Sequence, residues 1–156
     1  MAAASTSFPV PVSPSRSTGT RDRAMRDRVV NAPGTSFNGR AYWQAAAQCG
    51  GVYFKLGSIE SDAAVRAKVI KPDPAAYSSF TKDADTANRN ATAFFNAAER
   101  FLMADRKFSR EEAVMTYDVV ASASGDRVKT ADAAALAIKP CLQLYEICHV
   151  EEAKAA

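Results

Sequence analysis

The sequence carries few side chains that could supply catalytic chemistry. His149 is the only histidine among the 156 residues, and it lies near the end of the sequence, although a serine or cysteine nucleophile usually needs a neighbouring base. Carboxylate pairs do occur, such as Asp83 with Asp85 and Glu111 with Glu112. Such near neighbours point to different faces of a helix. We therefore predict charged helix surface, no catalytic residues and a protein that is not an enzyme.

Glu146 and His149 have the Glu-x-x-His spacing by which ferritin-like bundles bind two metal ions. That site requires a second such pair on another helix, and a chain with one histidine cannot provide it. Gly50-Gly51 lacks the following Lys-Ser or Lys-Thr of a phosphate-binding loop. The sequence therefore predicts no metal site and no cofactor.

Cys141 and the pair Cys148-His149 resemble the haem-attachment sequence of bundle cytochromes of the cytochrome c′ type. The attachment sequence is Cys-x-x-Cys-His, whereas six residues separate the two cysteines here. The resemblance implies a haem carrier, which we keep as part of an alternative function.

The first 38 residues have the composition of a flexible tail. They are rich in Ala, Ser, Thr, Pro, Gly and Arg and hold few large apolar residues, so little burial can offset the entropy of ordering them. Residues 16–40 contain six arginines and two aspartates. We predict a disordered basic tail that can contact a partner through Arg21, Arg23, Arg26 and Arg28. In the rest of the chain both signs of charge are mixed, which does not predict nucleic-acid binding.

Behind the tail, apolar residues recur at steps of three and four, the spacing of one buried helical face. The expected helices cover residues 39–56, with a weaker extension over 63–69 after Gly57, then 77–104, 109–125 and 130–152. We expect Pro140 to kink the last helix. Four helices with short connections predict an all-α, antiparallel, up-down-up-down four-helix bundle over residues 39–156.

Local signals mark the helix ends and one close contact. Asp73 precedes a proline and is expected to cap the second helix. Ser109 and Glu112 have the spacing of a capping box at the start of the third helix. Gly50 and Gly51 lie inside a helix, where glycine is unfavourable, and they predict close approach of another backbone.

The three cysteines allow a disulfide between the first and fourth helices. Those helices are antiparallel neighbours in the predicted bundle, so Cys49 should lie level with Cys141. Cys141 cannot bond to Cys148 within one helix, because their rise of about 10.5 Å exceeds the reach of a disulfide. Two alternatives stay open: a Cys49–Cys148 bond in a different helix register, and three free thiols in a reducing cytosol.

No stretch of the sequence approaches the roughly 18 consecutive apolar residues of a membrane-spanning helix. The beginning of the sequence lacks the charged leader and continuous apolar run of a secretory signal, which predicts a cytoplasmic protein. A disulfide at Cys49 would instead indicate a periplasmic or secreted protein.

These observations favour a non-enzymatic interaction or accessory module, in which the bundle presents a surface to a protein partner and the tail adds a second contact. The alternative is a small-ligand or haem carrier. Its ligand would occupy the alanine-lined interior of the bundle beside Tyr42, Trp43 and Phe94. The sequence leaves the oligomeric state open.

Overall fold

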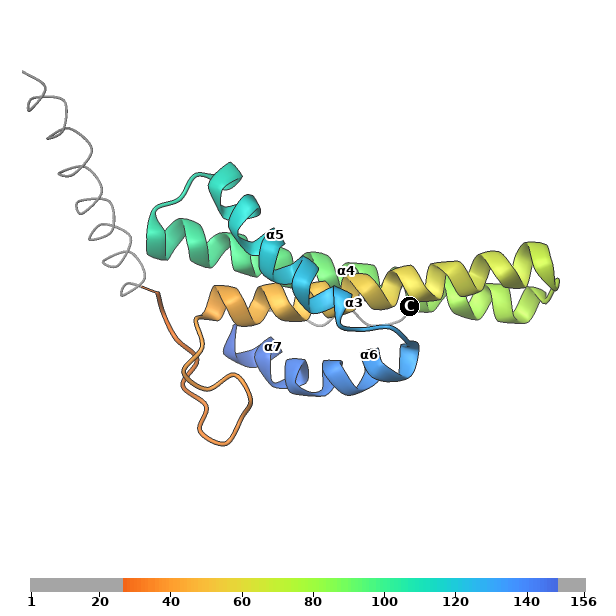
Figure 1. Ribbon diagram of the computed structural model, residues 1–156, viewed down its shortest axis with the longest axis horizontal. Helices are drawn as coiled ribbons and strands as arrows, with labels where there is room; N and C mark the ends of the chain where they lie inside the picture. Colours follow the sequence, from red (N-terminus) through yellow and green to blue (C-terminus); the bar gives the residue numbers. More distant parts are fainter. Residues whose placement is uncertain (1–26, 149–156) are drawn as a thin grey trace, which may run out of the picture.

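The computed structural model describes residues 27–148, which are helical apart from their loops and one isolated bridge between Val29 and Ala41 (Figure 1). The elements, labelled as in Figure 1, are α3 (Tyr42–Val65), a π-helical turn (Arg66–Ile70), α4 (Pro74–Arg106), α5 (Arg110–Asp126), α6 (Ala131–Ile138), a 3₁₀ turn (Lys139–Gln143) and α7 (Leu144–Ile147). This arrangement confirms the all-α prediction. The predicted tail up to residue 26, and residues 149–156, lie outside the described part.

Successive helices run in opposite directions. Figure 1 shows α3 and α4 as a long hairpin, α5 lying across α3, and α6 and α7 returning along the opposite side. The segment from α6 through the 3₁₀ turn to α7 takes the place of the fourth helix, so the up-down-up-down prediction is confirmed. Between residues 27 and 148, no helix has the length and hydropathy that a membrane crossing requires.

The core lies mainly between α3 and α4 and combines small and large side chains. Phe94 and Leu102 are fully buried. Alanines surround them, and the fully buried ones include Ala45, Ala46, Ala47, Ala97 and Ala98. Because alanine adds only one methyl group, the two helix backbones can approach closely along this stretch.

The helix starts follow the local signals in the sequence. The Asp73 side chain accepts a hydrogen bond from the backbone N–H of Ala76, 3.1 Å away, with a proline in the first turn of α4. Ser109 and Glu112 form the reciprocal capping box of α5. Each cap satisfies backbone donors that the first helical turn leaves without a partner.

The predicted break at Gly57 is absent, because α3 continues through this residue to Val65. A Cβ atom at Gly57 would overlap the Asn88 side chain of α4. The glycine therefore allows close packing of two helices and does not end the first one. Helix propensity depends on the local sequence alone, so it could not predict this contact between two helices.

The fourth helix is broken at Pro140 and not merely kinked. α6 ends at Ile138, and the residues around the proline form the 3₁₀ turn before α7 begins. Proline removes a backbone donor, and its ring collides with the preceding helical turn. The helix predicted to reach residue 152 can be followed only to the end of the described chain.

The predicted tail needs correction at its C-terminal end. Residues 27–41 lie against the bundle, where Val30 is 1% exposed and Phe37 is 8% exposed. The segment folds back on itself through hydrogen bonds from the N–H of Val30 to the carbonyl of Arg40 and from the N–H of Gly39 to the carbonyl of Val30. Two isolated apolar residues have no helical spacing, so the sequence pattern did not reveal them.

Candidate functional site

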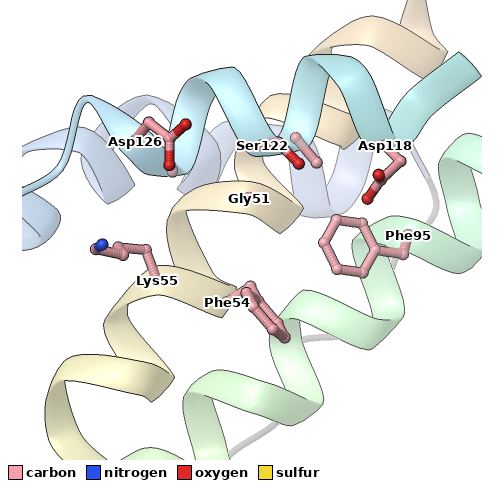
Figure 2. Close-up of a pocket in the computed structure, with 9 residues that line it drawn as sticks. Gly51, Phe54, Lys55, Phe95, Asp118, Ser122 and Asp126 are labelled. Atoms are coloured by element: carbon pink, nitrogen blue, oxygen red, sulfur yellow. The ribbon is translucent and has the colours of Figure 1, made fainter.

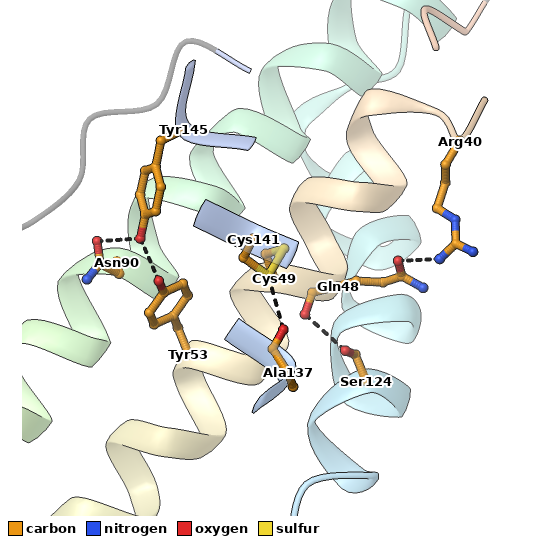
Figure 3. Close-up of a disulfide and its surroundings, with 9 residues drawn as sticks. All are labelled: Arg40, Gln48, Cys49, Tyr53, Asn90, Ser124, Ala137, Cys141 and Tyr145. Carbon is orange, nitrogen blue, oxygen red and sulfur yellow. Dashed lines mark hydrogen bonds between the residues drawn. A yellow bond between two sulfur atoms is a disulfide. The ribbon is translucent and has the colours of Figure 1, made fainter. Parts of the chain in front are cut away.

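Cys49 of α3 and Cys141 of the 3₁₀ turn form a disulfide, with their Cα atoms 5.7 Å apart (Figure 3). The sequence allowed Cys49 to pair with Cys141 or with Cys148, or all three thiols to be free. The structure contains the Cys49–Cys141 pair. Both residues are buried, at 0% and 1% exposure. The bond connects residues 92 positions apart and so ties α3 to the last helical segment.

Cys148 remains a free, fully buried thiol. Burial raises the pKa of this thiol to about 11, while the nearby positive charge of Arg100 acts in the opposite direction. The Arg100 guanidinium also donates a hydrogen bond to the Cys148 carbonyl at 3.3 Å. A thiol with this pKa is a poor nucleophile near neutral pH.

We expect the Cys148 thiol to be unreactive toward Ellman's reagent at pH 8 in the folded protein. With its pKa raised to about 11, only about one thiol in a thousand is ionised at that pH. Unfolding in urea should release one reactive thiol per chain, which is read from absorbance, and Cys148→Ser should abolish this signal. Rapid reaction before unfolding would contradict the buried position.

A buried hydrogen-bond network joins three helices beside the disulfide (Figure 3). The Tyr145 hydroxyl lies 3.0 Å from Oδ1 of Asn90 and 2.9 Å from the Tyr53 hydroxyl. Because the amide oxygen can only accept, Tyr145 donates to Asn90 and accepts from Tyr53. Asn90, which is 4% exposed, is thus bonded to α7, and the network fixes the orientation of α7 against α3 and α4.

The interior that a carrier would use is occupied by side chains. The Phe94 ring lies 4.9 Å from the Tyr145 ring and 5.8 Å from the Tyr53 ring. Tyr42 stacks on Phe101 with ring centroids 5.1 Å apart. Phe94 and its alanine neighbours are fully buried, so these aromatic residues serve as core at this level of the bundle.

The candidate metal-binding residues do not form a cluster in the described part of the chain. Glu146 is exposed on α7, and His149 lies outside the described residues. Among residues 27–148, no three histidine, cysteine, aspartate or glutamate side chains gather closely enough to hold a metal ion. Cys141 is already bonded to Cys49, which leaves no free thiol there for haem attachment.

The end of the predicted tail is clamped to the end of α4 by two reciprocal ion pairs. Asp27 binds Arg106 through both carboxylate oxygens, at 2.8 and 2.7 Å, and accepts a hydrogen bond from the Trp43 indole at 3.0 Å. Arg28 binds Asp105 at 2.7 Å. The hydrogen bonds from Arg106 to Asp27 raise the pKa of the guanidinium. Arg28 therefore holds the segment in place, while Arg21, Arg23 and Arg26 lie outside the described residues.

We expect Asp27→Ala to lower the free energy of unfolding by about 2 kcal/mol, because it leaves Arg106 and the Trp43 indole without their largely buried acceptor. Hydrogen exchange should also accelerate in residues 28–41. The control is Asp85→Ala, which removes an exposed pair with Arg89 and should cost less than about 0.5 kcal/mol. Equal losses in urea denaturation would show that the clamp is not structural.

A groove of about 280 Å³ lies between α3, α4 and α5 (Figure 2). Its floor is the crossing of α3 and α5 at Gly51, and its aromatic wall is Phe54 and Phe95. Lys55 and Asp126 lie at one end, and Asp118 lies beyond Phe95 at the other. The recess thus combines this aromatic wall with the Lys55 amine, the Ser122 hydroxyl and the carboxylates of Asp118 and Asp126.

The α3–α4 hairpin extends beyond the other helices, as the yellow and green end of Figure 1 shows. Leu56 and Ile59 still pack against the cluster that contains Ala134 of α6. We call residues 60–83, which follow, the arm. Ala64 is the one residue of the arm that is classed as buried. α6 still lies beside Glu60 and Asp83 at the base of the arm. Farther toward the tip, each of the two helices has only the other as a neighbour among the described elements (Figure 1).

The end of the arm combines exposed aliphatic side chains with cations, and the sequence analysis missed it. Val65, Val69 and Ile70 are 58%, 68% and 75% exposed. The cations are Arg66, Lys68 and Lys71, all exposed. A signal was present in the sequence, since residues 66–71 hold three positive charges and no acid between two helical patterns.

One face of the arm carries two adjacent grooves of opposite charge. The base groove, of about 460 Å³, lies beside α6 and contains Glu60 and Asp83. The tip groove, of about 550 Å³, contains Phe80, the cations of Arg66 and Lys71 and the single carboxylate of Asp73. Both lie on the same side of the hairpin, because the lining residues of each helix follow steps of three and four. On α3 and the π-helical turn these are Leu56, Glu60, Ala63 and Ala67, and on α4 they are Ala76, Phe80, Asp83 and Ala87.

Within the described chain, the arm is thus the part whose exposed apolar and charged side chains have no evident role in holding the bundle together. The disulfide, the Tyr145 network and the Asp27 clamp each have a structural role in holding helices or segments together. No known protein-family model matches this chain, and neither a curated protein nor a solved structure does so.

Proposed function

We propose that this chain is a non-enzymatic interaction module and that the arm is its binding element. The observation that supports the proposal is the uncovered hairpin face, which continues beyond the beginning of α6 and carries the half-buried Phe80. At the tip of the same hairpin, Ile70 is 75% exposed. Helices normally cover such a face against another element. Exposed apolar groups bordered by charges are typical of protein interaction sites.

The small number of buried residues in the arm also favours a binding partner for it. The arm buries little of its own surface, with Ala64 as its one buried residue. Its polar contacts include the Asp73 cap, the hydrogen bond from the Asp73 N–H to the Ala67 carbonyl, and Lys68 placed 5.4 Å from the centre of the Tyr77 ring. Covering apolar surface contributes about 25 cal/mol per Å². A bound partner would therefore stabilise both the complex and the arm.

The proposal keeps the basic tail as a second contact. Asp27 is bound to Arg106 at the end of α4, whereas the arm tip lies at its beginning (Figure 1). The 33 residues of α4 correspond to a length of about 50 Å. The described chain therefore begins at the end of the bundle opposite to the tip.

The disulfide supports an oxidising compartment as the place of action. Structural disulfides persist mainly in the periplasm or outside the cell, since cytosolic reductants keep most thiols reduced. The Cys49–Cys141 bond lies at 0% and 1% exposure in the core and joins the first and last helical segments. We propose a periplasmic or secreted location over a cytoplasmic one.

Site-specific photo-crosslinking in the native host tests the proposed role of the arm. A benzophenone-bearing residue is placed at position 70 on the arm or, as the control, at the exposed position 111 on α5. We expect position 70 to give one discrete crosslinked product on a denaturing gel and position 111 to give none. The products are identified by mass spectrometry.

A product of the same mass from both positions would indicate nonspecific contact and contradict the role of the arm. No discrete product from position 70 would do the same. A product that contains another protein would support an interaction module, and a product with twice the chain mass would identify the partner as a second copy.

A further inference from the structure

We infer that the arm binds a second copy of this chain, with the two arms antiparallel and the tip groove of each over the base groove of the other. This inference rests on the proposed role of the arm as the binding element. It goes further in naming the partner and its orientation.

Charge separation along the arm makes its face self-complementary. The base groove holds the carboxylates of Glu60 and Asp83. The tip groove holds the cations of Arg66 and Lys71 and one carboxylate, that of Asp73, which caps α4, so the tip keeps a net positive charge. A two-fold interface places the same patch of both subunits in contact, so residues at one end meet residues at the other. An antiparallel pair therefore places cations over carboxylates twice.

The two carboxylates at the base repel each other in the single chain. Burial and the negative charge of Asp83 together raise the pKa of Glu60. Repulsion between two like charges in one groove is relieved when opposite charges approach. Arg66 and Lys71 of a second copy would supply that charge from the end of an exposed arm.

The spacing of the residues fits this pairing. Glu60 near the end of α3 and Arg66 at the start of the π-helical turn are separated by a rise of about 9 Å, at 1.5 Å per residue. A two-fold axis midway between them, near Ala63, brings each end over its opposite. Phe80 lies in the tip groove on this same face with Ala63 and Ala67, so the two phenylalanine rings would meet near the axis against small alanines.

The pairing also completes the local architecture. At the level of the disulfide the 3₁₀ turn between α6 and α7 packs against α3, whereas the tip of the arm contains α3, the π-helical turn and α4 alone (Figure 1). Two arms side by side supply four helices and cover the face that α6 leaves open. A parallel pairing would instead place the three cations of each tip together, which like-charge repulsion disfavours.

Charge reversal tests the inference with purified full-length protein under oxidising conditions. Sedimentation velocity over a wide concentration range should show a reversible monomer–dimer equilibrium for the natural sequence. The base variant, Glu60→Lys with Asp83→Lys, and the tip variant, Arg66→Glu with Lys71→Glu, should each weaken dimerisation by at least about 30-fold, because each places like charges opposite each other.

Mixing the two variants should restore a 1:1 heterodimer, since the positive base of one then faces the negative tip of the other. The matched control is Glu111→Lys with Asp118→Lys, which makes the same change in charge at exposed positions on α5 and should leave dimerisation unchanged. Circular dichroism verifies that each variant is folded. Should a double variant fail to fold, Arg66→Glu alone, at an exposed position, is expected to show at least a fivefold weakening.

A natural sequence that stays monomeric at all concentrations would overturn self-pairing, and so would a dimer that none of the reversals affects. Neither result removes the proposed function, which the crosslink from position 70 to a different protein would still support. Loss of both the dimer and any crosslink would reject the arm as a binding element.

Discussion

Cys49→Ser is expected to lower the free energy of unfolding by about 4 kcal/mol. The disulfide closes a loop across 92 residues, and such a long loop removes much of the conformational entropy of the unfolded chain. Cys49 and Cys141 are also fully packed, so the serine hydroxyl would be buried among apolar neighbours. Urea denaturation followed by circular dichroism measures the loss.

Reduction provides the matched control for this prediction. A phosphine reductant should lower the denaturation midpoint of the natural sequence to nearly that of Cys49→Ser, and it should leave the variant unchanged. Cys148→Ser, which removes only the free buried thiol, should cost no more than about 1 to 2 kcal/mol. A midpoint that is insensitive to reductant, or a Cys49–Cys148 peptide in non-reducing mapping, would contradict the pairing.

Gly51→Ala is the second substitution with a large expected effect, a loss of about 3 kcal/mol. The added methyl group would overlap the backbone carbonyl of Ala121 on α5. A backbone atom within a packed helix cannot rotate away, so α3 and α5 would have to separate. The hydrogen bond of 3.0 Å from the Ser124 hydroxyl to the Gln48 carbonyl, which spans the same crossing, would lengthen (Figure 3).

Gly50→Ala serves as the control at the neighbouring position. Its methyl group would meet the edge of the Phe95 ring, and this half-buried side chain can shift. Both substitutions gain about 1 kcal/mol in helix propensity. The difference between their unfolding free energies therefore measures the cost of the overlap at the crossing of α3 and α5. We expect Gly50→Ala to change stability by less than about 1 kcal/mol. Equal losses in the two variants would show that the crossing is not tightly packed.

The local sequence was sufficient to predict the helices, and also those helix ends that are marked by a capping signal of a few residues. The capping box of Ser109 and Glu112 acts over one turn, and Asp73 caps its helix over the same distance. The aromatic and alanine spacing between Tyr77 and Phe101 predicts one buried face and therefore a bundle. These features depend on neighbours along the chain, so no tertiary information is needed to find them.

Contacts between distant residues decided the rest. From sequence alone Gly57 predicts a helix break, but in the structure it allows close contact with Asn88 of α4. Val30 is predicted to belong to the tail, but in the structure it is buried against the bundle. Helix order restricted the choice of disulfide, but only the actual register brings Cys49 to Cys141 and leaves Cys148 free.

The arm shows the same division between sequence and tertiary structure. The sequence determined that two long amphipathic helices are joined near Pro72, and it determined the basic segment over residues 66–71. Whether α6 covers the end of the hairpin depends on where α6 begins relative to α3. That position is set by the α5–α6 connection, in which Val128 packs against Val52 of α3. Such an offset is set by the packing of side chains far apart in sequence. Only the tertiary structure therefore shows that residues 60–83 extend beyond the bundle with a charged and apolar face exposed.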